Sequence, residues 1–163
     1  RETTVGGAAA VGSSGVGVDP AEVRFDAAAP VSASERARRA GGETLLLVED
    51  DPAVRQVTRT ALERSGFCVL EASNGPEALE VWRTRRGEVA LVVTDLVMPG
   101  GMSGQELARR LQAERPELKV IFMSGYSAAI AGRELELRDG ANFLQKPFPT
   151  EKLVATVRRC LVG

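Results

Sequence analysis

The chain has 163 residues, of which 44% are apolar and 26% are charged, and its formal net charge is −1. These values are typical of a globular protein with one ordinary domain and an additional segment. They give no reason to expect nucleic acid or an anionic membrane as a partner. No apolar run has the length of a membrane span and no signal peptide opens the sequence, so we expect a cytoplasmic protein whose segment makes no membrane contact.

The absence of histidine and the positions of the two cysteines limit the kinds of reaction that this chain can perform. Histidine is absent, which excludes a Ser-His-Asp triad, a histidine metal site and a phosphodonor histidine within these residues. Acid–base or nucleophilic chemistry must therefore use carboxylates, lysine and hydroxyl groups. Cys68 and Cys160 are far apart in the sequence and each lies in an apolar pattern, so both are expected to be reduced structural residues.

Composition divides the chain near residue 42. Residues 1–42 are rich in Gly, Ala, Ser and Val, contain a charged run at 35–39 and show no helical apolar stripe. This composition predicts a flexible linker. Residues 43–163 are regular instead, and we expect them to form one folded domain.

Five short apolar runs alternate with helical patterns in this domain. The expected strands are residues 45–48, 68–72, 89–93, 118–123 and 142–145. Short apolar strands separated by helices predict a parallel sheet that is covered on both faces. We therefore expect a doubly wound α/β fold, with a five-stranded parallel sheet in the order 2-1-3-4-5 flanked by five helices.

Local signals predict where the helices begin and end. Asp51 and Pro52 are expected at the N-cap and first position of the first helix, which Gly66 ends. The apolar spacing places four residues on its inner face: Val54, Val57, Ala61 and Leu62.

The later helices carry similar signals. Asn74 is expected to cap the second helix, and Ser103 opens the third through a capping box with Glu106. Residues 127–138 predict a weaker fourth helix. Thr150 is expected to cap the last helix.

Polar side chains follow four of the expected strands. In order, the strand ends are Glu49-Asp50-Asp51, Thr94-Asp95, Ser124-Gly125 and Lys146-Pro147. Ligands of doubly wound sheets bind at this edge. Adjacent carboxylates repel one another, and a hard cation such as Mg²⁺ relieves that repulsion. A carboxylate can also attack phosphorus, and a metal ion, an ammonium and a hydroxyl then stabilise the charge of the transferring group.

These strand ends resemble those of a known family, the receiver domains of bacterial two-component signalling, which have a flavodoxin-like fold. Four motifs carry the resemblance: Leu47-Val48-Glu49-Asp50-Asp51, Thr94-Asp95-Leu96-Val97-Met98-Pro99-Gly100, Met123-Ser124-Gly125-Tyr126 and Lys146-Pro147-Phe148. They occur in the family's order on the expected elements, and the resemblance covers residues 44–162.

The resemblance implies a metal site and a phosphoacceptor. Asp95 corresponds to the phosphorylated residue. Asp50 corresponds to a direct ligand of Mg²⁺ or Mn²⁺, and Glu49 to an acid that acts largely through water. The backbone carbonyl of Val97 is implied as a further metal ligand.

The resemblance also implies a switch. Ser124 corresponds to the residue that hydrogen-bonds the phosphoryl oxygen, and Lys146 to the ammonium that pairs with the phosphoacceptor. Phe143 stands where the family keeps a rotating aromatic, although it lacks a hydroxyl group. Phosphorylation is then expected to alter the face formed by the fourth helix, fifth strand and fifth helix. Pro147 is expected to follow a cis peptide bond.

Other interpretations were weighed for the same residues. A dehalogenase-type phosphatase also uses a strand-end aspartate, but it needs a second Asp where this chain has Val97. A P-loop nucleotide-binding protein is excluded because no G-x-x-x-x-G-K-[ST] motif is present. The intact acidic pair, with Asp95, Ser124 and Lys146, argues against a receiver-like module that is never phosphorylated. A role for Phe143 as a simple core residue stays open. Asp51 fits a helix cap better than a metal ligand.

The larger protein is a separate question. Residues 98–104 and 122–127 resemble receivers fused to the C-terminus of hybrid histidine kinases, and residues 6–26 resemble the closing hairpin of a kinase ATP-binding domain. A stand-alone response regulator is the alternative. In either case the receiver itself is no conventional enzyme, and the implied phosphodonor is a histidine kinase or a histidine phosphotransfer domain.

Overall fold

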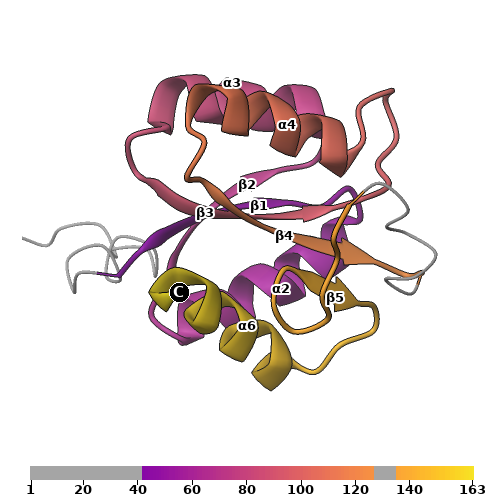
Figure 1. The fold of residues 1–163 in the computed structure, drawn as a ribbon. Coiled ribbons are helices and arrows are strands. Elements are labelled where there is room, and N and C mark those ends of the chain that lie inside the picture. The colour runs from indigo at the N-terminus through magenta and orange to yellow at the C-terminus, as the bar shows by residue number, and fades with distance from the viewer. Residues whose placement is uncertain (1–41, 127–134) are drawn as a thin grey trace, which may run out of the picture. The chain divides into compact units, whose positions relative to one another are not determined.

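The computed structural model describes residues 42–126 and 135–163 of the chain. Its centre is a parallel five-stranded sheet in the order β2-β1-β3-β4-β5 (Figure 1), as expected from the sequence. The strands are β1 (Thr44–Val48), β2 (Cys68–Ala72), β3 (Val89–Asp95), β4 (Lys119–Ser124) and β5 (Phe143–Gln145). The expected linker at 1–42 lies outside the described residues, apart from residue 42.

Helices cover both faces of this sheet, which confirms the doubly wound arrangement. They are α2 (Pro52–Arg64), α3 (Gly75–Arg85), α4 (Gly104–Glu114) and α6 (Thr150–Val162). In Figure 1, α3 and α4 lie on one face, whereas α2 and α6 lie on the other. No helix in the described part of the chain is both long and apolar enough to cross a membrane.

Two apolar cores result from this layering. Val92 on β3 points into the core beneath α3 and α4, which also contains Trp82 and Leu111. Its neighbours Leu91 and Val93 point into the core beneath α2 and α6. The strands are therefore buried on both faces, which explains why their sequences are continuous apolar runs rather than alternating ones.

The expected fourth helix is the one part of the fold that the structure only partly describes. Residues 127–134 of that segment lie outside the described residues. Residues 135–138 are described and are not helical, so the prediction of a helix reaching residue 138 is wrong. Leu135 is partly buried and packs at the edge of the core beneath α3 and α4.

Most of the predicted helix N-caps are confirmed. Asp51 accepts hydrogen bonds from the Ala53 and Val54 amides at 2.8 and 3.2 Å, and Asn74 accepts one from the Glu77 amide at 2.8 Å. The expected cap at Thr150 is wrong. Thr150 is the first residue of α6, and the N-cap is Pro149, which makes no side-chain cap.

The predicted inner face of α2 needs one correction. Val57 is 67% exposed, and Thr58 is buried in its place. Thr58 can be buried because its hydroxyl donates to the Val54 carbonyl at 2.7 Å, within the helix. The apolar spacing was therefore right to within one position along the helix, which is a rotation of about 100°.

Candidate functional site

The carboxyl ends of the central strands lie side by side because of their pairing register. Val48, the last residue of β1, pairs with Ala72 on β2 and with Thr94 on β3. Glu49 follows Val48 and Asp95 follows Thr94, so these two acids lie next to each other. Backbone hydrogen bonds extend the alignment across the edge, since the Leu96 amide donates to Met123 at 2.9 Å and the Lys146 amide donates to Ser124 at 2.8 Å.

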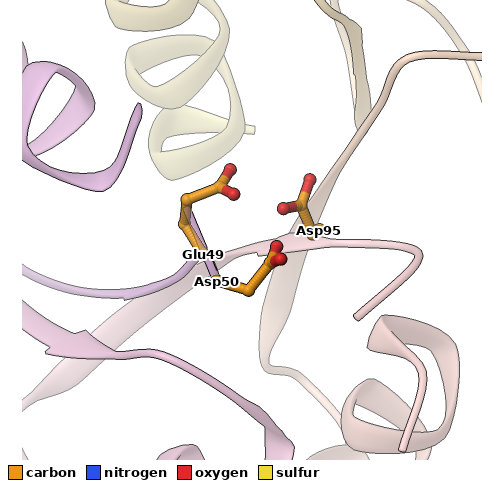
Figure 2. A group of neighbouring side chains, drawn as sticks. All are labelled: Glu49, Asp50 and Asp95. Carbon is orange, nitrogen blue, oxygen red and sulfur yellow. The ribbon is translucent and has the colours of Figure 1, made fainter. Parts of the chain in front are cut away.

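Three carboxylates converge at this edge (Figure 2). Glu49, Asp50 and Asp95 each have an oxygen within 4.8 Å of the other two. Glu49 is only 1% exposed and Asp95 is 5% exposed, whereas Asp50 is exposed to solvent. The acids that the sequence proposed for a metal site are thus brought together, two of them buried and one open to solvent.

Lys146 lies between the two buried acids. Its ammonium is 2.5 Å from Oε2 of Glu49 and 2.8 Å from Oδ1 of Asp95. The Glu49 carboxylate also accepts a hydrogen bond from the Asp51 amide at 3.1 Å. The Lys146–Pro147 peptide is cis, as expected. One ammonium therefore serves two buried carboxylates.

This shared partner leaves the two acids with different proton affinities. Burial, followed by the hydrogen bond to Glu49, raises the pKa of Asp95 to about 8, because Lys146 offsets only part of these effects. Burial also acts to raise the pKa of Glu49, but hydrogen bonds with Asp95, Lys146 and the Asp51 amide outweigh it and lower that pKa. The pKa of Lys146 is raised, because its two acidic partners outweigh burial.

The donor set fits a hard divalent cation. Carboxylate oxygens are the ligands that Mg²⁺ prefers, usually with water in its other positions. The two buried acids share a single ammonium and the exposed Asp50 adds a third carboxylate beside them, so a cation would offset the burial and the neighbouring acid that raise the pKa of Asp95. Val97 lies two residues beyond Asp95 with an exposed side chain, and its carbonyl remains a predicted ligand.

Ser124 and Phe143 lie on the neighbouring strands. Ser124 is buried at the end of β4, where its hydroxyl accepts a hydrogen bond from the Tyr126 amide at 3.1 Å. Phe143 is 1% exposed and belongs to the core beneath α3 and α4. Its proposed role as a rotating switch stays a prediction, since the structure has a single, fully buried position for it.

One contributor to the site was missed in the sequence. Gly104 is the first residue of α4, and a Cβ atom there would lie only 1.9 Å from the carbonyl oxygen of Asp95. Its amide donates to the Leu96 carbonyl at 2.9 Å. Gly104 thus lets α4 pack directly on the backbone of the candidate phosphoacceptor. The available signal was a glycine directly after the N-cap Ser103, where a better helix former is expected.

Comparison with known proteins agrees with this geometry. A family model described as "Response regulator receiver domain" matches residues 45–158. Among curated proteins, the sensor kinase CckA of Brucella abortus is 42% identical over 138 residues, which are 82% of this chain but 14% of CckA. The response regulator receiver protein CpdR of the same organism is 36% identical over 119 residues, which are 73% of this chain and 97% of CpdR.

Solved structures give the same fold. A crystal structure of the receiver domain from the hybrid histidine kinase CckA has a TM-score of 0.60 and 32% sequence identity, and the match covers 72% of this chain and 98% of that chain. The chain spans about a seventh of the length of the curated CckA that it matches, so this similarity concerns the receiver region only.

Proposed function

This chain belongs to the response regulator receiver family of two-component signalling, and we propose that residues 43–163 accept a phosphoryl group on Asp95. The observation that carries this proposal is the position of the Asp95 carboxylate. It is buried at the end of β3, 2.8 Å from the Lys146 ammonium and beside two further acids. The alternatives lack a comparable site, since a dehalogenase-type phosphatase needs an acid where Val97 stands.

The transfer uses groups of this chain. A carboxylate oxygen of Asp95 attacks the phosphorus atom of a phosphohistidine, and a P–O bond forms as the P–N bond breaks. The imidazole nitrogen leaves with the electron pair and takes a proton from solvent. Asp95 must be ionised to attack, so its proton has to leave first. Lys146 stabilises the negative charge on the transferred group, and the Ser124 hydroxyl donates to one of its oxygens.

A divalent metal ion completes the proposed site. Glu49, Asp50, Asp95 and the Val97 carbonyl would hold Mg²⁺ or Mn²⁺. When bound, the ion supplies positive charge to the phosphoryl oxygens and favours ionised Asp95. Glu49 would act on the ion largely through water, since Lys146 already binds one of its carboxylate oxygens.

Phosphorylation is proposed to act on the rest of the domain through β4 and β5. Movement of Ser124 towards a phosphoryl oxygen breaks its hydrogen bond with the Tyr126 amide. The space that it leaves is open to Phe143, one strand away. The two changes are proposed to bias the face that the resemblance assigns to the fourth helix, β5 and α6, although residues 127–134 lie outside the described residues.

A hollow beside the site fits the phosphodonor domain. It has a volume of about 510 Å³, and it adjoins Lys146. Its lining residues are Ala53, Val54, Val57, Thr58, Lys146, Pro147 and Phe148. The exposure of Val57, which the helical pattern did not predict, is explained if a histidine kinase or histidine phosphotransfer domain docks its own apolar helix here.

The whole protein is proposed to be a hybrid sensor histidine kinase, because the similarity to CckA is higher than that to CpdR. Residues 1–42 would then be the linker from the kinase ATP-binding domain or the end of that domain. The reading frame before Arg1 tests this. A kinase domain with its own histidine supports the hybrid, whereas a start codon immediately upstream supports a stand-alone regulator similar to CpdR.

Acetyl phosphate tests the transfer directly. With Mg²⁺ present, the mass of the intact protein should rise by one phosphoryl group, and Asp95→Asn or chelation should abolish the gain. Ser103→Ala is a matched control, since it removes only a helix cap. Labelling of the Asp95→Asn variant at the wild-type rate would refute the proposal.

A further inference from the structure

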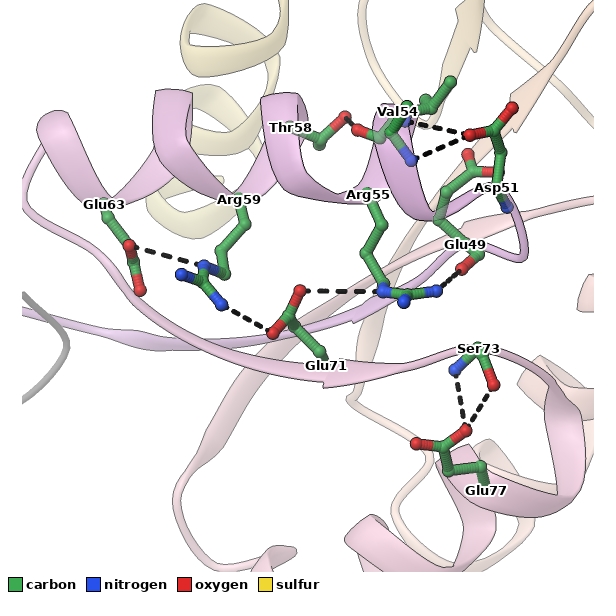
Figure 3. Close-up of polar contacts among 11 residues, drawn as sticks. Glu49, Asp51, Val54, Arg55, Thr58, Arg59, Glu63, Glu71, Ser73 and Glu77 are labelled. Carbon is green, nitrogen blue, oxygen red and sulfur yellow. Dashed lines mark hydrogen bonds and ion pairs between the residues drawn. The ribbon is translucent and has the colours of Figure 1, made fainter.

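The Glu49 carbonyl is held in an unusual way at the edge of the sheet. The Glu49 amide still pairs with β2 and donates to Ala72 at 3.1 Å, but its carbonyl oxygen lies beyond the last strand pair. That oxygen accepts a hydrogen bond from Nη1 of Arg55 at 2.8 Å. Arg55 belongs to the first turns of α2, so its side chain folds back over the β1–α2 turn (Figure 3).

Acidic side chains hold this arginine in place. Nε of Arg55 lies 3.6 Å from Oε1 of Glu71, which is on β2 beside the end of β1. The other oxygen of Glu71 accepts from Nη1 of Arg59 at 2.8 Å. Arg59 in turn lies 3.6 Å from Glu63 on the same helix. Figure 3 shows the resulting row of alternating charges, which runs along α2 and ends at the Glu49 carbonyl.

We propose that Arg55 is a positioning residue that preorganises the cation site through this carbonyl. The inference rests on the proposed function, because it assumes that Asp50 is a metal ligand. The carbonyl belongs to the peptide unit that also contains the Asp50 amide, and the next peptide unit is held by the hydrogen bond from the Asp51 amide to Glu49. With both flanking peptide planes held, the direction in which the Asp50 side chain leaves the backbone is restricted. No described residue hydrogen-bonds the Asp50 carboxylate, which makes the backbone its main constraint.

The charge of Arg55 and its position have opposite effects on Mg²⁺ affinity. A guanidinium near the site repels an incoming cation, so removal of Arg55 or Arg59 should slightly tighten Mg²⁺ binding if only Coulomb forces act. If Arg55 acts by position, its removal weakens Mg²⁺ binding instead. Arg59 provides the matched control, since it is on the same helix and binds the same Glu71 but does not touch Glu49.

The test is isothermal titration of the metal-free protein with MgCl₂. The variants are Arg55→Met, Arg55→Lys and Arg59→Met, with circular dichroism and thermal melts to check the fold. We expect Arg55→Met to weaken Mg²⁺ affinity by about tenfold, the lower end of the range for outer partners of metal ligands. Arg59→Met should bind as tightly as wild type or slightly more tightly. Arg55→Lys should be intermediate, because an ammonium on a flexible stem keeps the charge but lacks the planar fork that binds its partners in fixed directions.

Several outcomes would overturn the inference. Arg55→Met could bind Mg²⁺ as tightly as wild type, or Arg59→Met could lose as much affinity as Arg55→Met. If Arg55→Met does not fold, Arg55→Lys decides, and wild-type affinity in that variant refutes the role of the guanidinium fork. A wild-type protein that binds no Mg²⁺ and is not labelled on Asp95 would refute the proposed function itself, and with it the role of Arg55.

Discussion

Gly104→Ala should lower both stability and phosphorylation, although the helix itself favours alanine. Gly104 lies inside the first turn of α4, where alanine is the better residue by about 1 kcal/mol. Helix propensity alone therefore predicts a more stable protein. The tertiary structure predicts the opposite, because a Cβ atom at this position meets the backbone of Asp95.

The size of the effect follows from the distances. The added Cβ would lie 1.9 Å from the Asp95 carbonyl oxygen, 2.9 Å from its carbonyl carbon and 3.1 Å from Cα of Leu96. Carbon atoms pack at about 3.5–4.0 Å, so α4 and the end of β3 must separate. Overpacking costs about 1–3 kcal/mol, and a contact this short with backbone belongs at the upper end, about 3 kcal/mol, from which the gain in helix propensity of about 1 kcal/mol is subtracted. A net loss of about 2 kcal/mol lowers the melting temperature by roughly 8 °C.

Two glycines provide controls for this variant. Gly87→Ala adds a Cβ that meets nothing within 4 Å. Gly75→Ala places its Cβ 2.5 Å from Sδ and 2.9 Å from Cβ of Met102, so it tests a clash with a side chain instead of the Asp95 backbone. Urea unfolding and the rate of labelling by acetyl phosphate should be measured for all three variants. Gly75→Ala should lose some stability and Gly87→Ala none, but only Gly104→Ala should label more slowly, because the strained atom is the carbonyl of the proposed phosphoacceptor. A Gly104→Ala protein as stable as wild type would refute this reasoning.

Two further predictions concern the acids. Asp50→Asn should raise the melting temperature of the metal-free protein, because it removes one of three adjacent carboxylates, and it should abolish the rise that Mg²⁺ causes in wild type. The metal-free stability of wild type should fall as the pH rises from about 5 to 8. In that range folded Asp95 keeps a proton, given its pKa of about 8, whereas unfolded Asp95 is ionised. Each unfolding event therefore releases a proton, and Mg²⁺ affinity should rise over the same range because the cation displaces that proton.

Melting curves with and without Mg²⁺ at several pH values check both predictions. A lower melting temperature for metal-free Asp50→Asn would mean that its charge is already compensated. For the pH dependence, Asp95→Asn is the control, and its stability should change less between pH 5 and 8. The lowered pKa of Glu49 acts in the other direction, but only below its ordinary value of 4.5. An equal slope in wild type and Asp95→Asn would contradict the assignment.

The sequence alone predicted the features that depend on near neighbours or on repeated patterns. The helix caps at Asp51 and Asn74 bind amides two or three residues away, so local sequence is sufficient to find them. The five strands were recognisable because burial on both faces demands continuous apolar runs. The grouping of Glu49, Asp50 and Asp95 could be inferred because parallel strands present their carboxyl ends at one edge of the sheet.

The tertiary structure decided what depends on contacts between distant segments. The exposure of Val57 and the burial of Thr58 follow from the rotation of α2 against the sheet, which helical spacing defines only approximately. The burial of Asp95 beside Glu49, which raises the pKa of Asp95, and the sharing of Lys146 by these two acids need segments about fifty positions apart in the chain. Gly104 packs against the backbone carbonyl of Asp95, and Arg55 donates to that of Glu49. A carbonyl is present at every residue, so only the folded structure selects which one a side chain or a close-packed glycine will meet.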